Sequence, residues 1–320
     1  MSVALVTGGA GFIGSHLVDR LLDEGWFVRV IDNFSTGRWE NLKQHRGNPR
    51  LEVLVGDLKN IGDCLKAVKG VDVVFHFASN PEVRVSSIEP TLHFNDSVVA
   101  TFNLLEAMRK CGVKELVFAS SSSVYGEPEQ IPVDESATVR PVSVYGACKL
   151  ACESLIHAYS RLYGIRAIIL RYANVVGSRL RHGVIYDLLM KLANNPRELE
   201  VLGDGTQVRS FIHISDAIEG TLIAWRKTTE NYAVYNVASE DWITVSEVAK
   251  IITKALGLEN VRIVYRPILN GVGWLGDVKR IALKIDKLKS LGFRPKYSSK
   301  EAVYLTVKEL SRELSILPNY

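Results

Sequence analysis

The fold class follows from the N-terminal stretch Val3-Ala-Leu-Val-Thr-Gly8-Gly-Ala-Gly11-Phe-Ile-Gly14. An apolar run typical of a buried strand leads into glycines with the spacing G-x-x-G-x-x-G, and a helical pattern of apolar residues follows at once. Gly8 permits a tight turn, Gly11 allows the backbone to approach a pyrophosphate, and Gly14 lets the helix pack close to the strand. The N-terminus of such a helix also attracts an anion. The stretch predicts a dinucleotide site; the alternative is an ordinary strand–helix turn.

An acidic residue supports the dinucleotide interpretation. The next predicted strand, 27–31, runs into Asp32, about twenty residues after the glycine loop, where a carboxylate can accept a hydrogen bond from an adenosine ribose hydroxyl. The negative charge of Asp32 would repel a 2′-phosphate. The sequence therefore favours NAD over NADP as the cofactor.

The composition excludes several classes of protein. The chain has 320 residues, and its 39 basic and 35 acidic residues leave a net charge of only +4, with no basic run of the kind that follows a nucleic-acid backbone. No apolar stretch is long enough to span a membrane, and the N-terminus leads directly into a strand instead of a signal peptide. The cysteines form neither a CxxC pair nor a metal-like cluster, and Cys148 and Cys152 are interpreted as small buried residues. We expect a cytoplasmic protein that holds no metal and contacts neither nucleic acid nor membrane.

Strands and helices alternate through the first half of the chain. Further strands are predicted at 51–55, 71–77, 115–120 and 166–171, and helices over about 98–110 and 147–163. This order predicts an α/β fold, a doubly wound parallel sheet of the Rossmann type with ligands beyond the carboxyl ends of the strands. Small or polar residues at several strand ends would converge on one crevice: Thr7-Gly8, Asp32-Asn33, Gly56-Asp57, Ala78-Ser79 and Ser120 to Ser123.

The alternation stops after Arg171. Capping-box patterns at 244–247 and 298–301 predict two helices, and 270–276, rich in glycine, is interpreted as a loop over a site. We expect residues 1–173 to form an NAD-binding domain, with part of 212–240 returning to it. Residues 174–320 would form mainly a smaller, interleaved substrate-binding lobe.

A second motif, Tyr145-Gly-Ala-Cys-Lys149, predicts a reaction centre. Positions i and i+4 of a helix share a face, so the phenol and the ammonium lie together. A lysine and an oxidised nicotinamide would both favour the phenolate and lower the pKa of the tyrosine. Alone, this spacing would more often be a surface tyrosine near a solvated lysine. The serines of Ser120-Ser-Ser-Ser-Val-Tyr-Gly126, at the end of the fifth strand, could bind the substrate oxygen that exchanges its proton with Tyr145.

A series of motifs occurs in order along the chain: Thr7-Gly-Gly-Ala-Gly-Phe-Ile-Gly-Ser-His-Leu17, Asp32-Asn-Phe-Ser-Thr-Gly37, Gly56-Asp-Leu58, Ser121-Ser-Ser-Val-Tyr-Gly126, Tyr145 to Lys149, Arg171-Tyr-Ala-Asn174 and Gly203-Asp-Gly-Thr-Gln-Val-Arg209. This series resembles the extended short-chain dehydrogenase/reductases. Within them it is most similar to the nucleotide-sugar 4-epimerases, and above all to the UDP-glucose (UDP-galactose) 4-epimerases. The resemblance extends nearly to the end, at Leu291-Gly-Phe-Arg-Pro295.

The resemblance implies a set of contacts to NAD. The residues assigned to the pyrophosphate are Gly8, Gly11, Phe12, Ile13 and Gly14. Those assigned to the adenosine ribose and its surroundings are Asp32, Asn33, Ser35, Thr36 and Gly37, with Asp57 and Leu58 near the adenine. The residues that would line the rest of the cofactor are Phe77, Ala78 and Ser79, with Tyr172 near the nicotinamide.

The resemblance also assigns the reaction centre and the substrate contacts. Ser121 and Tyr145 would be the catalytic hydroxyls, and Lys149 would bind the nicotinamide ribose and tune Tyr145. Arginine suits phosphate because it stays charged and forms forked hydrogen bonds, although an arginine at a strand end can also be merely solvated. The residues assigned to the UDP-sugar substrate are Ser121, Ser122, Ser123, Tyr145, Asn174, Gln207, Arg209 for the pyrophosphate and Asp277 for the uridine ribose.

Three positions depart from the family pattern. Ser97 replaces the usual asparagine, Trp274 replaces the usual second phosphate arginine, and Lys284 stands where an aspartate is often seen. Arg209 would then hold the pyrophosphate with less help, or Arg280 or another basic residue would compensate. Trp274 would pack either on the substrate or in the core.

The implied reaction interconverts UDP-galactose and UDP-glucose. Tyr145 as phenolate takes the proton of the sugar 4-hydroxyl while the C4 hydride passes to NAD. The 4-keto sugar then rotates, and the hydride returns to its opposite face. Alternatives are another nucleotide-sugar 4-epimerase, a nucleotide-sugar dehydratase or decarboxylase, and an NAD-sensing binding protein. Dehydratases usually carry an acid pair where this chain has Ser122 and Ser123, and sensors often lack the tyrosine or lysine.

Two further expectations follow from the resemblance. Ile281 stands where a bulky tyrosine would argue for unmodified hexoses, so UDP-N-acetylhexosamines remain open as substrates. The helices near 98–110 and 147–163 resemble those that form a four-helix dimer interface in relatives, so a homodimer is expected. The alternative is that the apolar faces of these helices belong to the core.

Overall fold

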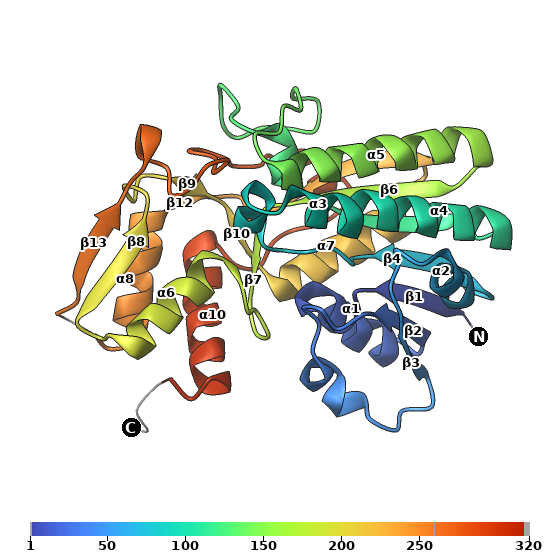
Figure 1. The fold of residues 1–320 in the computed structure, drawn as a ribbon, viewed down its shortest axis with the longest axis horizontal. Helices are drawn as coiled ribbons and strands as arrows, with labels where there is room; N and C mark the ends of the chain where they lie inside the picture. The colour runs from blue at the N-terminus through green and yellow to red at the C-terminus, as the bar shows by residue number, and fades with distance from the viewer. Residues whose placement is uncertain (1, 259, 317–320) are drawn as a thin grey trace.

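The first lobe is built on a sheet of seven parallel strands (Figure 1). The computed structural model describes residues 2–258 and 260–316. The strand order is β11-β6-β5-β4-β1-β2-β3. Strands β1 to β6 have the order of a doubly wound fold, and β11 is added at the edge beside β6. The strands are β1 (Val3–Thr7), β2 (Phe27–Asp32), β3 (Leu51–Val55), β4 (Val73–His76), β5 (Glu115–Ser121), β6 (Arg166–Tyr172) and β11 (Tyr232–Val237). The predicted parallel sheet is confirmed.

The strands form from nearly continuous apolar runs because helices cover both faces of the sheet. Ala4, Leu5 and Val6 of β1 are fully buried. The predicted strand 71–77 is shorter in the structure, since the N–H of Val71 donates to the carbonyl of Val68 in a turn. The last strand, β11, pairs with β6 from Tyr232 opposite Ala167 to Val237 opposite Tyr172, so the chain returns to this sheet after leaving it.

Helices pack on each face of the sheet. One apolar cluster joins the sheet to α1 (Phe12–Asp23) and α7 (Ile214–Lys227). The other cluster joins it to α2 (Ile61–Val68), α4 (Ala100–Cys111) and α5 (Val144–Tyr163). The predicted helix near 98–110 is α4, preceded by α3 (Pro90–His93) and by the π-helical turn η3 (Phe94–Val99).

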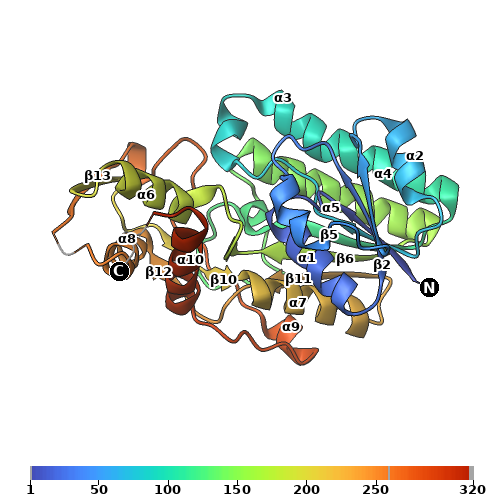
Figure 2. The ribbon, with the colours of Figure 1, turned by 90° about the horizontal axis from the view of Figure 1, so that it is seen from below.

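The second lobe has its own apolar core around α6 (Gly183–Asn194), α8 (Val245–Ala255) and α10 (Ser299–Glu313). Figure 2 shows these helices together on the side of the molecule away from the N-terminus. Both predicted capping boxes are present, at Thr244 with Glu247 and at Ser298 with Glu301. Its strand pairs are β8 (Glu198–Leu202) with β13 (Arg262–Arg266), β7 (Asn174–Val176) with β10 (Phe211–His213), and β9 (Val208–Arg209) with β12 (Ile243–Thr244).

The remaining described elements are short. They are η1 (Trp39–His45), η2 (Val83–Ser87), η4 (Ser122–Tyr125), η5 (Leu269–Gly271) and α9 (Asp286–Ser290). Cys148 and Cys152 are buried on α5, as predicted. Within the described ranges, no helix has the length and apolar character that crossing a membrane requires.

Candidate active site

A cavity of about 520 Å³ lies where the carboxyl ends of the sheet strands face the second lobe. Its size is typical of a small-molecule site. The predicted convergence of strand ends is confirmed, because residues from the ends of β1, β2, β3, β4 and β5 all line this cavity: Gly8, Asp32, Asn33, Gly56, Asp57, Ala78, Ser79 and Ser120 to Ser123. Among the described residues, no group of three His, Cys, Asp or Glu side chains is placed to hold a metal.

The glycine loop has the geometry of a pyrophosphate cradle. Gly8 has φ +66°, and a Cβ on Gly14 would lie only 2.2 Å from the carbonyl oxygen of Gly8. The N-cap of α1 is Gly11, and no side chain caps its first turn. Phe12 and Ile13 of that turn line the cavity. The uncapped N–H groups therefore suit a bound anion.

Asp32 faces the cavity from the end of β2. Its Oδ2 accepts from the N–H of Ala10 at 2.9 Å, and its Oδ1 accepts from the N–H of Phe34 at 2.8 Å. Burial raises the pKa of Asp32, while these two N–H groups oppose the shift. Gly37, also predicted to contact the cofactor, does not line the cavity. A Cβ at Gly37 would lie 2.7 Å from Asp32 Oδ1, so the glycine instead makes room for the carboxylate.

The predicted reaction centre assembles at the middle of the cavity, where Ser121, Tyr145 and Lys149 all line the wall. Helix α5 begins at Val144, earlier than predicted, because the Ser143 side chain accepts from the N–H of Gly146 at 3.1 Å. Tyr145 therefore lies in the first turn. Lys149 Nζ lies 5.8 Å from the centre of the Tyr145 ring.

Lys149 is buried without a carboxylate partner among the described residues. Its Nζ donates to the carbonyl of Ala119 at 2.9 Å. The nearest acid along the helix, Glu153, is instead bound by Arg171 at 2.7 Å and by the Ser120 hydroxyl at 2.5 Å. Burial lowers the pKa of Lys149 to about 8, and the nearby Cys152, Cys148 and Glu153 offset this shift only in part.

The end of the cavity that is predicted to bind the substrate, called the substrate end below, contains an ion pair. Arg209 Nη2 lies 2.7 Å from Asp277 Oδ1, and Asp277 Oδ2 accepts from the N–H of Gly273 at 3.0 Å. Trp274 of the same loop also lines the cavity, and its buried Nε1 has no hydrogen-bond acceptor in the described part of the chain. Arg280, suggested as a compensating cation, is exposed and does not line the cavity.

Two predicted substrate residues use their amides locally. Gln207 donates to the carbonyl of Leu202 at 3.1 Å and accepts from the N–H of Gly205 at 3.0 Å, so it braces the preceding turn. Asn174 donates to the carbonyl of Ser210 at 3.2 Å. Both side chains nevertheless line the cavity.

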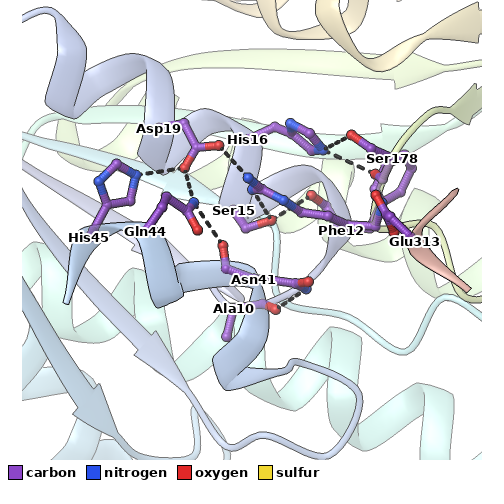
Figure 3. Close-up of polar contacts among 11 residues, drawn as sticks. Ala10, Phe12, Ser15, His16, Asp19, Asn41, Gln44, His45, Ser178 and Glu313 are labelled. Carbon is purple, nitrogen blue, oxygen red and sulfur yellow. Dashed lines mark hydrogen bonds and ion pairs between the residues drawn. The ribbon is translucent and has the colours of Figure 1, made fainter. Parts of the chain in front are cut away.

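Polar contacts join the two lobes beside the glycine-loop helix (Figure 3). The guanidinium of Arg179 binds Asp19 at 2.8 Å and the Ser15 hydroxyl at 3.1 Å, both on α1. The main-chain N–H of Arg179 donates to Glu313 of α10 at 3.0 Å. The His16 ring also meets the carbonyl of Ser178 at 3.1 Å. The segment 178–179 therefore connects the glycine-loop helix to the second lobe.

Comparison with known proteins decides the family. The model of the "NAD dependent epimerase/dehydratase family" matches residues 4–238. The chain belongs to this family. A crystal structure of UDP-galactose 4-epimerase shares 48% identity, covers 98% of this chain and 99% of its own, and has a TM-score of 0.87. The UDP-glucose 4-epimerase of Thermus thermophilus in complex with NAD shares 34% identity over 96% and 98% of the two chains, with a TM-score of 0.85. The UDP-glucose 4-epimerase of Streptomyces lividans is 34% identical over 270 residues, 79% of this chain and 80% of its own.

The resemblance to extended short-chain dehydrogenase/reductases is thus confirmed, and the cofactor of the epimerase is NAD. The uncapped helix N-terminus, the glycine cradle and Asp32 fit the pyrophosphate and ribose of a dinucleotide. All the NAD contacts predicted from the sequence line the cavity except Gly37, namely Gly8, Gly11, Phe12, Ile13, Gly14, Asp32, Asn33, Ser35, Thr36, Asp57, Leu58, Phe77, Ala78, Ser79, Tyr145, Lys149 and Tyr172. The predicted substrate contacts also line it: Ser121, Ser122, Ser123, Asn174, Gln207, Arg209 and Asp277.

The protein environment of Tyr145 disfavours the phenolate. Burial raises the pKa of Tyr145 to about 12, and the Ser121 hydroxyl opposes this shift. Loss of solvent disfavours charge on both Tyr145 and Lys149. That the lysine and an oxidised nicotinamide together favour the phenolate stays a prediction.

The sequence missed several cavity residues of the second lobe and the strand connections. Arg84, Arg179, Arg181 and His182 all line the site. No local pattern marks Arg84, whose place in the cavity depends on how the two lobes pack.

Proposed function

We propose that this epimerase interconverts UDP-galactose and UDP-glucose. The proposal rests on one observation: Ser121, Tyr145 and Lys149 line the middle of a cavity with the glycine cradle at one end and the Arg209–Asp277 pair at the other. A nucleotide sugar that reaches from the ion pair to Tyr145 would present its hexose to the reaction centre. The 4-epimerases of known structure cited above support this assignment.

The side chains at the centre have complementary roles in this proposal. When bound, NAD supplies a hydride acceptor and then a hydride donor for C4 of the sugar. Tyr145 takes the proton from the 4-hydroxyl and returns it after the sugar has rotated. Ser121 holds the same oxygen, and the Lys149 ammonium favours negative charge nearby. Arg209 and Asp277 hold the nucleotide, so that only the hexose reorients.

A dehydratase or decarboxylase is the competing assignment within the family. Elimination needs an additional acid and base near the sugar, whereas Ser122 and Ser123 occupy the positions of that pair. Serine hydroxyls are not carboxyl groups and do not supply such an acid–base pair. The geometry therefore favours epimerisation, and retention of Tyr145 and Lys149 argues against a non-catalytic NAD sensor.

The decisive experiment incubates the enzyme with a panel of UDP-hexoses without added reductant and separates the products. We expect UDP-galactose and UDP-glucose to interconvert with no net change in NAD. A dehydrated or decarboxylated product would support the competing assignment. Activity on none of the sugars would refute the epimerase assignment.

Substrate breadth depends on Ile281 in this proposal. Its side chain is buried and lines the cavity. An isoleucine leaves more room than a tyrosine for an N-acetyl group. If UDP-N-acetylgalactosamine is accepted by the enzyme, Ile281→Tyr should reduce its kcat/KM roughly tenfold or more while sparing UDP-galactose. Equal loss on both sugars would contradict this role.

We also propose a cytoplasmic homodimer that pairs α4 and α5 with their copies. The two helices pack against each other and lie side by side at the surface in Figure 1. Phe102 of α4 and Leu162 of α5 are exposed. Light scattering after size-exclusion chromatography should give the wild type a molar mass twice that of one chain. The Phe102→Glu variant should have the molar mass of a single chain. An unchanged monomer mass for both proteins would refute the dimer.

A further inference from the structure

One arginine of the cavity differs from the others in its electrostatic environment. Five arginines line the cavity: Arg38, Arg84, Arg179, Arg181 and Arg209. Four of them have a carboxylate within ion-pair distance: Arg38 with Glu40, Arg179 with Asp19, Arg181 with Glu313, and Arg209 with Asp277. Within the described residues, Arg84 has no such partner. Its positive charge is the one among these five that no acid offsets.

Arg84 reaches the substrate end of the cavity although it belongs to the first lobe. It lies in η2 (Val83–Ser87), which follows β4 after the cofactor-lining residues. Its guanidinium carbon lies 5.9 Å from the centre of the Trp274 ring, in the loop of the second lobe. A guanidinium held over an aromatic face keeps its N–H edges available for hydrogen bonds.

Trp274 brings this guanidinium close to the ion pair that faces the nucleotide. The N–H of Asp277 donates to the carbonyl of Trp274 at 3.2 Å, so the tryptophan and the acid share one turn. Asp277 in turn binds Arg209. Because Asp277 offsets the charge of Arg209, this pair alone is a weak counterion for a diphosphate.

We propose that Arg84, seated on Trp274, is the second cationic contact for the diphosphate of the nucleotide-sugar substrate. This inference rests on the proposed function, since it presumes a nucleoside diphosphate at the Arg209 end. The buried Trp274 Nε1, which lacks an acceptor among the described residues, is a further donor for the same oxygens. Trp274 stands where relatives have a phosphate-binding arginine. In this proposal it positions Arg84 of the first lobe, which supplies the missing positive charge.

The test measures binding of UDP, uridine and NAD by titration calorimetry to the wild type, Arg84→Ala and Arg84→Lys. We expect Arg84→Ala to weaken UDP binding roughly tenfold to a hundredfold, as loss of a charged hydrogen bond does. Uridine and NAD binding should change less than about twofold. Lysine should restore part of the UDP affinity because it keeps the charge but loses the planar stacking.

Arg280→Ala is the matched control, because Arg280 is an exposed arginine of the neighbouring segment that does not line the cavity. Trp274→Ala should weaken UDP binding, and its effect should not add to that of Arg84→Ala. Equal effects of Arg84→Ala and Arg280→Ala on UDP would overturn the inference. The inference would also be overturned if Arg84→Ala weakened uridine binding as much as UDP binding, or if it weakened NAD binding alone.

The binding test is separate from the test of the reaction. If the wild type binds UDP and Arg84→Ala does not weaken it, Arg84 is not a diphosphate contact even if the enzyme epimerises UDP-galactose. If the wild type binds UDP through Arg84 but epimerises no UDP-hexose, the contact stands and the proposed reaction fails. The same variants therefore distinguish the two failures.

Discussion

The two ends of the cavity are built by different means. At the cofactor end, the contacts come from the backbone of the first β–α unit, and Asp32 is fixed by the N–H groups of Ala10 and Phe34. At the substrate end, Arg209 is fixed by Asp277, which lies 68 residues further along the chain. The same loop carries Trp274, which meets Arg84 of the other lobe. One end depends on local chain geometry and the other on distant side chains.

This difference suggests which end tolerates change. A backbone cradle can be disturbed by a single methyl group, because close-packed backbone atoms cannot move aside. A side-chain contact can be moved between positions, provided that a charge of the same sign reaches the same place. The replacement of a phosphate arginine by Trp274, with Arg84 nearby, would be one such exchange.

The largest effect should come from the residue at which the two ends meet. Tyr145→Phe removes the proton acceptor, and we expect kcat to fall roughly a thousandfold. Binding of NAD and UDP should remain within about twofold, because the phosphate and ribose contacts at the two ends of the cavity are kept. Steady-state kinetics and calorimetry measure the two quantities. Tyr304→Phe, on an exposed position of α10, is the control. Near-normal turnover by Tyr145→Phe would remove the tyrosine from the mechanism.

A methyl group added at Gly14 should weaken NAD binding without affecting the substrate end of the cavity. In Gly14→Ala the new Cβ would meet the carbonyl of Gly8 at 2.2 Å, so the loop must shift. We expect NAD affinity to fall roughly a hundredfold, with a loss of about 1–3 kcal/mol in unfolding free energy. Gly62→Ala, on α2, is the control, since its Cβ would meet only the Asn60 side chain, at 3.1 Å. If NAD affinity is unchanged, the cradle does not hold the pyrophosphate.

Loss of the ion pair should affect the substrate end with a smaller effect. Arg209→Ala removes the proposed phosphate contact, and we expect UDP affinity to fall roughly tenfold to fiftyfold while NAD affinity stays constant. Arg266→Ala, which removes an exposed ion pair with Glu200 in the same lobe, should change neither. A parallel loss of NAD affinity in Arg209→Ala would show that the two ends are not independent.

The smallest effect concerns the stability of the protein, and it comes from the buried charge of Lys149. Burial lowers the pKa of Lys149 to about 8. Below that pH the lysine is charged in the folded protein, and its buried charge lowers the free energy of unfolding. Between about pH 8 and pH 10.5 the unfolded state binds more protons, so stability rises with pH. Urea denaturation near pH 7 should therefore give Lys149→Met a free energy of unfolding about 1–3 kcal/mol higher than that of the wild type. This difference should shrink toward pH 10.

Lys66→Met, at an exposed position of α2, is the control for that comparison and should show no such pH dependence. Activity of Lys149→Met should fall even though the protein is more stable, because the ammonium serves the reaction. A variant that is less stable than the wild type at every pH would contradict the inference that Lys149 is an uncompensated charge.

Most of the cofactor end could be predicted from the sequence because its determinants are local. The glycine spacing, Asp32 and the Tyr145–Lys149 motif each lie within one strand–turn–helix unit, and periodicity places them. Gly37 does not line the cavity, and its sequence position does not reveal that its missing Cβ makes room for Asp32. The start of α5 was misplaced because Ser143 was not considered as an N-cap.

The substrate end could be predicted only in part. Arg209 and Asp277 follow from the family pattern, but their direct contact does not. Arg84 carries no local signal, because its role depends on the approach of two lobes that fold from distant segments. The pKa of Tyr145 was also beyond the sequence, since the spacing of Tyr145 and Lys149 shows their proximity but not the loss of solvent around both.

The pairing of β11 with β6 has a consequence for dissecting the molecule. β6 carries Ala167, Ile168, Ile169 and Leu170, all fully buried, and β11 occupies its outer edge from Tyr232 to Val237. A fragment that stopped at residue 173 would leave that edge as a row of unpaired N–H and C=O groups on an apolar strand. Such an edge is a template for self-association between fragments. The isolated N-terminal segment should therefore aggregate, and a dissection that keeps the sheet intact must retain 232–237 with it.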